Sequence, residues 1–321
     1  MIASYGARLL LLCLASYFLA NLALTLVLRL ALPLLLRGAE SMRASRASWF
    51  LFCARIAPAT FALLFVLAFC VPSYLWLEPG GVAERTTLAG LLVACCGFAL
   101  VVAACARTAS ALWRSRTYLQ TAHTCSAHAN ESVLVIPSTR PLFALAGLFR
   151  PRLVISSDLL DSLTPEQFEM AARHERAHEA GYDNIKKLAT ILSPLALPFS
   201  SGFAALERQM AKFTEWAADD RAIAGDPEKA VILADALVRV ARLNGLPTVA
   251  APELISTLVS EACSLDDRVL RLLDLHQPAE KVRSYHLAFL SAAIVLAAVA
   301  VWLGLPATLS GLHVALEHFF G

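Results

Sequence analysis

Residues 9–28 read LLLLCLASYFLANLALTLVL, an uncharged apolar stretch that decides the class of fold. A transmembrane helix needs about 20 predominantly apolar residues, and this stretch meets that length without a single charge. Of the 321 residues in the chain, 58% are hydrophobic and 16% are charged, and the mean hydropathy is +0.63. Soluble domains average roughly 45–50% apolar and about 25% charged residues. The composition therefore excludes a disordered chain and indicates a membrane protein.

Three further stretches have the same character. Residues 49–77 contain only one charge, Arg55, residues 88–106 contain none, and residues 285–305 carry only His286 near their start. The sequence therefore predicts four transmembrane helices, three before the middle of the chain and one near its end. The first is too long for the apolar core of a signal peptide, and no A-x-A cleavage site follows it. The eight cysteines offer no C-x-x-C spacing and lie mostly in apolar runs, so we expect no disulfide framework.

Basic residues are distributed unevenly between the loops of the predicted spans. The loop 37–48 is rich in arginine, whereas the loop 78–87 carries a single one. Because cytoplasmic loops are enriched in lysine and arginine, the pattern predicts an outside N-terminus, a cytosolic segment 107–283 and an outside C-terminus. Arg29 and Arg55 lie near the inner ends of their spans, where long side chains can reach the headgroups.

The chain is therefore expected to have four parts. These are a three-span region (residues 1–106), a cytosolic domain (107–283), a fourth transmembrane helix (284–305) and a short extracytoplasmic tail (306–321). The cytosolic insert is long enough for one domain of ordinary size. A fifth apolar stretch, residues 188–205, is interrupted by prolines. It is either buried within the domain or dips into the membrane interface, and both interpretations stay open.

The insert contains the sequence HERAH at 174–178, an H-E-x-x-H motif. The preceding TPEQ at 164–167 predicts a capped helix that runs through the motif. Positions i and i+4 lie on one face of a helix, so His174 and His178 could share one Zn²⁺. Glu175 follows on the same helix and could take a proton from water held at the metal.

A catalytic zinc site takes three protein ligands and keeps a fourth position open. Glu215, in the stretch EWAAD on a helix predicted over about 204–224, is the expected third ligand. Asp219, one turn further, could accept a hydrogen bond from a ligand histidine. Taken alone, both acids would be better interpreted as solvated helix positions, but the H-E-x-x-H motif favours the ligand interpretation. Asp183 either supports a histidine in the same way or caps the end of the zinc helix, and both remain open.

These motifs resemble those of the gluzincin membrane metallopeptidases, and most closely the BlaR/MecR-type transducers that sense β-lactams. The resemblance rests on HERAH, on Asp183-Asn184 and on Glu215-x-x-Ala218-Asp219. In addition, GLFRPRLVI at 147–155 and SLDDRVLRL at 264–272 resemble the family's segments before the zinc helix and after the third ligand.

The resemblance implies a mostly α, multi-pass protein of the bacterial inner (cytoplasmic) membrane with four transmembrane helices. A cytosolic α+β zinc peptidase domain would be inserted between spans three and four. It further implies Zn²⁺ bound by His174, His178 and Glu215, with Glu175 as general base and with Asp219 and Asp183 supporting the histidines. The implied activity is that of a metalloendopeptidase in transmembrane signalling, with a cytosolic protein, such as a winged-helix repressor of the BlaI/MecI type, or the chain itself as substrate.

The transducers carry a penicillin-binding sensor after their fourth span. Here residues 306–321 follow that span, and no S-x-x-K occurs in the chain, so we expect no acyl-serine sensing. No glycine-rich phosphate loop or basic stripe is present, and direct nucleic-acid binding is not expected. An extended substrate is expected to lie alongside the predicted strand 152–156.

Two alternatives remain. Heat-shock and CAAX-processing membrane metallopeptidases share the zinc motifs but arrange their spans differently, so we rank a quality-control peptidase of that type second. A signalling scaffold without catalysis is the other alternative. An intact set of ligands and an intact Glu175 argue against it, since drift would break one of the four positions.

Overall fold

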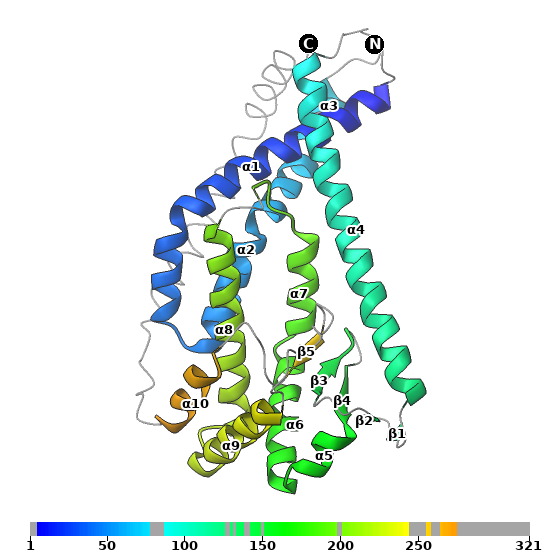
Figure 1. Ribbon diagram of the computed structural model, residues 1–321. Coiled ribbons are helices and arrows are strands. Elements are labelled where there is room, and N and C mark those ends of the chain that lie inside the picture. Colours follow the sequence, from blue (N-terminus) through cyan, green and yellow to red (C-terminus); the bar gives the residue numbers. More distant parts are fainter. Residues whose placement is uncertain are drawn as a thin grey trace.

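The computed structural model describes residues 5–77, 87–125, 129–130, 133–137, 142–148, 151–197, 201–243, 255–257 and 264–274. Within these residues the chain is mostly helical and has one small sheet (Figure 1). The predicted fourth span, residues 285–305, lies outside the described residues. The mostly helical class is therefore confirmed for the part of the chain that the structure describes.

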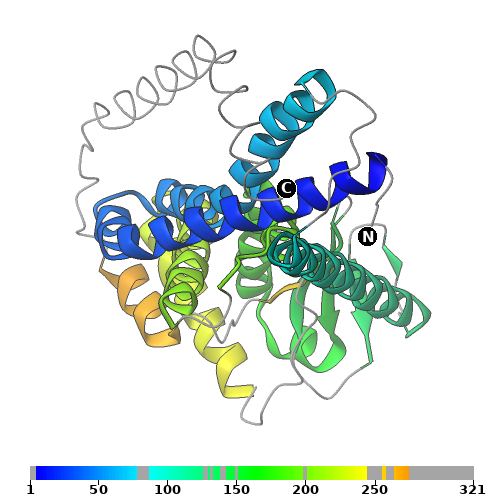
Figure 2. The same cartoon turned by 90° about the horizontal axis from the view of Figure 1, so that it is seen from above.

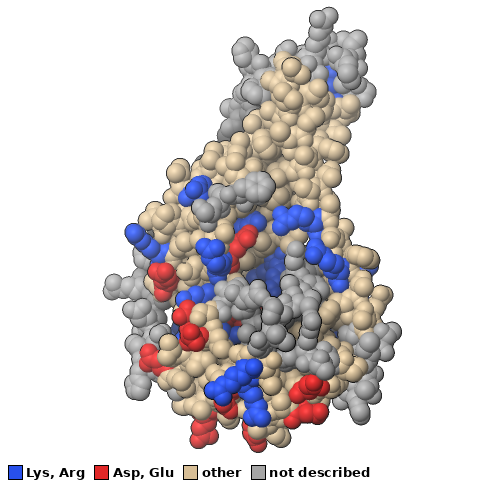
Figure 3. Space-filling view, in the orientation of Figure 1, with Lys and Arg blue, Asp and Glu red and all other residues tan. Residues whose placement is uncertain are grey.

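Three helical segments are long and apolar enough to cross a membrane. Their most apolar windows have mean hydropathies between 2.1 and 2.6. The first is α1 (Tyr5–Glu40) and the third is α4 (Leu88–Cys125), while α2 (Ala44–Phe65), a π-helical turn (Val66–Cys70) and α3 (Val71–Leu77) follow one another as the second. Figure 3 shows that the upper part of the molecule, formed by these helices, is largely without charged side chains. The three predicted spans that the structure describes are therefore helical, as the prediction of a membrane protein requires.

The helices extend further than the apolar stretches that predicted them. α1 runs to Glu40 and α2 begins at Ala44, so the loop expected over 37–48 is reduced to a short turn. α4 continues without a break past residue 106, where the sequence suggested a domain boundary. Arginine, leucine and alanine are all good helix formers, so a helix can continue where its sequence becomes charged.

The first and third spans approach each other closely at Gly97. A Cβ added to Gly97 of α4 would overlap the backbone carbonyl of Leu14 in α1. Small residues allow the backbones of membrane helices to come this close. The glycine therefore fixes how α1 and α4 pack.

We expect Gly97→Leu to destabilise the protein by about 1–3 kcal/mol or more, because overpacking forces backbones apart. The measurement is thermal unfolding of the purified protein in detergent. Ala99→Leu is the matched control, because Ala99 is exposed on the same helix. Equal unfolding temperatures for the two variants would contradict the close contact.

The remaining helices and a five-stranded sheet form the lower part of Figure 1. The helices are α5 (Ser157–Ser162), α6 (Pro165–Ala180), α7 (Asp183–Leu192), α8 (Ser201–Ile223), α9 (Pro227–Leu243) and α10 (Leu265–Leu273). The strands are β1 (Ala129–Asn130), β2 (Val133–Ile136), β3 (Phe143–Ala146), β4 (Arg152–Ser156) and β5 (Ile255–Thr257), in the order β1-β2-β4-β3-β5. Only β2 and β4 are parallel, and the other pairs are antiparallel.

Among the described residues, a small apolar core packs α4 on the sheet and includes Leu134, Ala144, Ala146 and Val154. Two larger apolar cores hold the remaining elements. One joins the sheet to α6 and α9 and includes the buried side chains Phe143, Ile155, Met170, Leu233 and Leu237. The other joins α1 and α2 to α8 and includes Leu28, Leu32, Leu51, Phe203, Leu206 and Phe213. Figure 2 looks down on α1 and α2 where they lie over α8. Helix α8 therefore belongs to both parts of the molecule, and it positions the carboxylate described next.

Candidate metal centre

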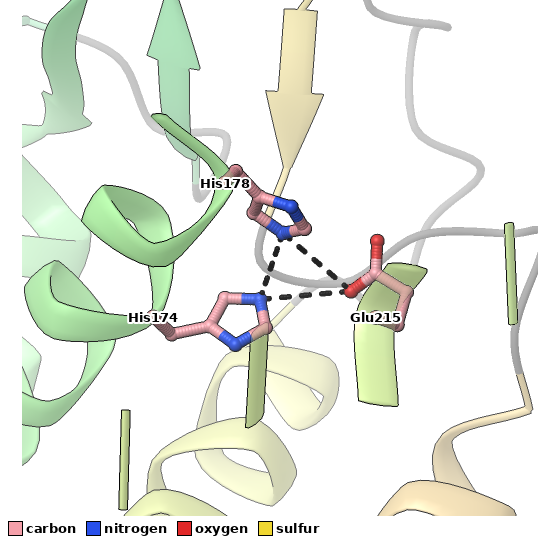
Figure 4. Close-up of side chains that lie close together, drawn as sticks. All are labelled: His174, His178 and Glu215. Atoms are coloured by element: carbon pink, nitrogen blue, oxygen red, sulfur yellow. Dashed lines mark hydrogen bonds and ion pairs between the residues drawn. The ribbon is translucent and has the colours of Figure 1, made fainter. Parts of the chain in front are cut away.

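Helix α6 presents the two histidines of the motif. Its start is a capping box, in which Gln167 N donates to Thr164 Oγ1 at 3.3 Å and Thr164 N donates to Gln167 Oε1 at 2.9 Å. The predicted helix start is thus confirmed. His174 and His178 lie one turn apart on the buried face of α6. Their rings project toward α8 (Figure 4).

Glu215 of α8 faces the two histidines. The Nε2 atoms of His174 and His178 are 3.1 Å apart, and Glu215 Oε2 lies 3.6 Å from the first and 3.9 Å from the second (Figure 4). Bonds of about 2.0–2.2 Å to a tetrahedral Zn²⁺ would place ligand atoms about 3.3–3.6 Å apart. The two nitrogens and one oxygen therefore fit a zinc ion with little adjustment, and this His-His-Glu group could hold a metal ion.

The ring nitrogen Nδ1 of each histidine is in contact with a carboxylate. Asp219 Oδ1 lies 2.9 Å from His174 Nδ1, and Asp183 Oδ2 lies 2.8 Å from His178 Nδ1. Such partners fix the ring orientation and turn the Nε2 atom toward the metal. For Asp183, this contact with His178 is the one expected from the first of the two interpretations that the sequence left open. Gly181 leaves room for that contact, since a Cβ there would lie 3.0 Å from Asp183 Oδ1.

The buried carboxylates and histidines make the site favourable for a cation. Burial opposes the charged form of His174, but the carboxylates of Asp219 and Glu215 outweigh this and raise its pKa to about 9. At His178, burial outweighs the effect of the nearby carboxylates and lowers the pKa of the imidazole. Burial would likewise raise the pKa of Glu215, yet the guanidinium of Arg268 and the nearby histidines lower it, which keeps its carboxylate ionised.

Glu175 is fully buried next to the ligand set. Neither of its carboxylate oxygens has a hydrogen-bond partner among the described residues. Burial raises the pKa of Glu175 to about 8. A buried polar group without a partner is costly, and such groups mark sites where a ligand or an ion is bound. The sequence interpretation of Glu175 as the base beside the metal fits this environment.

Arg268 completes the centre in a way that the sequence did not specify. Its Nε and one terminal nitrogen donate to the two carboxylate oxygens of Asp219 at 3.0 and 2.7 Å. Its other terminal nitrogen lies 3.1 Å from Glu215 Oε2. Arg268 lies in the stretch 264–272 that resembles the family's segment after the third ligand. The structure identifies Asp219 and Glu215 as its partners.

Lys186 links the centre to the second span, and sequence reasoning missed it. Its Nζ lies 2.6 Å from Asp183 Oδ1, 3.4 Å from Ser48 Oγ and 4.7 Å from the centre of the Trp49 ring. Burial would raise the pKa of Asp183, but its bonds to His178 and Lys186 lower it. No local sequence pattern predicts this contact, because Ser48 and Lys186 are 138 residues apart.

The strand expected to accept substrate cannot do so. β4 is paired along one side with β2 and along the other with β3. Its backbone groups are therefore already used, and the expectation of substrate alongside residues 152–156 is wrong. Within the described part of the sheet, β5 is the edge strand on the β3 side, and it contacts α6 and α7.

We expect Asp183→Ala to weaken zinc binding about 10–100-fold, because a partner that orients a ligand histidine is lost. Isothermal titration of the metal-stripped protein with Zn²⁺ measures the effect. Asp161→Ala, which removes an exposed acid close to the end of the nearby helix α5, is the control. Unchanged affinity in Asp183→Ala would show that the contact with His178 does not support a metal ligand.

Of the six residues singled out in the sequence, His174, His178 and Glu215 form the group that could hold a metal ion. Asp219 and Asp183 contact the two histidines, and Glu175 is buried next to His174 on α6. No protein-family model matches the chain, and a search of curated proteins finds no match either. The family resemblance of the motifs therefore remains a prediction that rests on the residues and their geometry.

Proposed function

We propose that the chain is a membrane-embedded zinc-dependent endopeptidase of the BlaR/MecR-like gluzincin type. The observation that carries the proposal is the placement of His174, His178 and Glu215 within bonding distance of one ion, with Glu175 buried beside them. Three protein ligands and an adjacent carboxylate are the composition of a hydrolytic zinc site. A purely structural zinc site has four protein ligands and needs no such carboxylate.

The proposed setting is a bacterial inner membrane. The chain would cross the membrane four times, and a cytosolic peptidase domain would be inserted between the third and fourth spans. Both chain termini would lie on the extracytoplasmic side. The arginines at the lower ends of the spans and the positive-inside rule support this orientation. The upper part of the molecule in Figure 3 carries few charged side chains, which supports its placement within the bilayer.

The chemistry is hydrolysis of a peptide bond. When bound, Zn²⁺ would polarise the scissile carbonyl and acidify a water molecule. Glu175 accepts a proton from the attacking water as the water oxygen bonds to the carbonyl carbon, and it delivers this proton to the leaving amine as the C–N bond breaks. A buried carboxylate without a hydrogen-bond partner among the described residues is free to take and return a proton in this way. Asp219 and Asp183 hold the two ligand rings in place during the reaction.

The substrate is proposed to bind as an extended segment at the sheet edge near α6. β5 supports this, because it is an edge strand of the described sheet and its side away from β3 has no strand partner among the described residues. A cytosolic protein, such as a repressor of the BlaI/MecI type, or this same chain would be the substrate.

The proposal is tested by removing and restoring the metal. Purified protein in detergent is stripped with 1,10-phenanthroline, and cleavage of casein and of the chain itself is followed on gels. Cleavage should stop and return on addition of one equivalent of Zn²⁺, with metal content measured by mass spectrometry. A protein that binds zinc at His174, His178 and Glu215 yet cleaves neither substrate would favour the signalling scaffold instead.

A further inference from the structure

The connection between α7 and α8 is hydrogen-bonded to the interior of the first span. Asn21 of α1 is fully buried, donates from Nδ2 to Pro194 O at 3.0 Å and accepts at Oδ1 from Ala196 N at 3.0 Å. Asn21 lies about 10 Å along the helix from the Leu28 end of the charge-free stretch. An amide placed in hydrocarbon requires such partners. The contact therefore places residues 194–196 alongside the apolar part of α1.

The second span also forms hydrogen bonds to the connection between α7 and α8. Arg55 of α2 is buried, and it donates to Ser193 O and to Glu207 Oε1, each at 2.9 Å. Arg55 also lies within an apolar stretch, 49–77. Non-helical backbone at membrane depth is tolerated only where protein groups satisfy it. Asn21 and Arg55 provide this for the backbone groups of Ser193, Pro194 and Ala196.

Some apolar side chains in and around the connection between α7 and α8 pack against the spans, and others lie exposed on the surface. Leu195 and Phe203 are buried in the core shared with α1 and α2. By contrast, Leu192 is 52% exposed and Leu197 is 37% exposed in the described structure. Large apolar side chains exposed next to transmembrane helices are suited to contact acyl chains rather than water.

We propose that α7 and the first half of α8 form a re-entrant hairpin, whose tip at residues 192–197 enters the bilayer leaflet that contains Arg29 and Arg55. Asn21 and Arg55 fix the tip, and Leu192 and Leu197 contact lipid chains. The half-exposed Glu207, paired with Arg55, lies at the polar boundary of this leaflet. Between the two interpretations of residues 188–205 that the sequence left open, this selects entry into the membrane.

The hairpin sets the depth of the metal centre. Glu215 follows Glu207 on α8 and lies about 12 Å further along the helix. α7 begins at Asp183, the residue that supports His178. The centre is thereby held close to the membrane surface, within reach of segments that emerge from the bilayer.

The test measures the water accessibility of single added cysteines in the full chain. Leu192→Cys, Val231→Cys and Leu64→Cys are each placed in phosphatidylcholine nanodiscs, which leave both faces of the bilayer open. Val231 of α9 and Leu64 of α2 match Leu192 in exposure, at 53% and 52%. Labelling with a maleimide-polyethylene glycol is read as a gel shift against the parent chain. The same nanodiscs carry a phospholipid with a diazirine in its acyl chain, and adducts are mapped by mass spectrometry.

The thiol added in Leu192→Cys is expected to label at least about tenfold more slowly than the one in Val231→Cys and as slowly as the one in Leu64→Cys, because a thiol in hydrocarbon does not ionise. Photolysis is expected to attach lipid to the peptide containing residue 192. Labelling of Leu192→Cys as fast as that of Val231→Cys would overturn the proposal. Protection of the thiol in Leu192→Cys without a lipid adduct would also overturn it, since protein rather than lipid would then cover the hairpin.

Discussion

Glu175→Gln is expected to retain zinc and to lose peptidase activity by about 10²–10⁴-fold, the usual contribution of a positioned general base. The substitution keeps the size of a fully buried side chain and removes only its ability to accept a proton. Because Glu175 is not one of the three ligands, zinc content should stay at one equivalent. The measurements are cleavage of casein and of the chain itself, together with metal analysis of the same preparation.

Glu179→Gln provides the matched control. Glu179 is one turn further along α6 and is exposed, so the same chemical change occurs on the same helix away from the centre. We expect this variant to cleave like the parent. If Glu175→Gln retained full activity with zinc bound, the carboxylate would not be the base. The peptidase mechanism proposed for this centre would then fail.

The elements that could be predicted from the sequence are those with local signals. The capping box at Thr164 and the i, i+4 spacing of His174 and His178 placed the motif on a helix, and the structure has α6 there. Glu215 was found because the EWAAD stretch lies on a second predicted helix. The three charge-poor stretches predicted the three apolar helices because length and composition alone determine whether a helix can span a membrane.

The contacts that could not be predicted join residues far apart in the chain. The bonds of Lys186 to Ser48 and of Asn21 to Pro194 span 138 and 173 residues. No periodicity or capping pattern encodes such pairs, because they depend on how the spans pack against α7 and α8. The sheet order is another example. Strand β4 was recognised from its β-rich composition, but only the paired structure shows that it is central and closed to substrate.

Arg268→Ala is expected to destabilise the metal-free protein by about 3–5 kcal/mol, the cost of breaking a buried ion pair by removing one partner. Arg268 is 2% exposed, and its guanidinium contacts the carboxylates of both Asp219 and Glu215. Without it, two buried acids face each other next to the histidines. Arg271→Ala is the control, because it breaks a pair with the exposed Asp220. An exposed pair is worth only about 0–1 kcal/mol.

Zinc should distinguish a charge effect of Arg268 from a packing effect. A metal ion that binds the folded state stabilises it by mass action, and in Arg268→Ala it would also supply the positive charge that the two acids have lost. We therefore expect saturating Zn²⁺ to raise the unfolding temperature of Arg268→Ala more than that of the parent. Thermal unfolding of stripped and zinc-loaded samples measures both shifts. Equal shifts would mean that Arg268 acts by filling space, and that its charge does not balance the carboxylates of the centre.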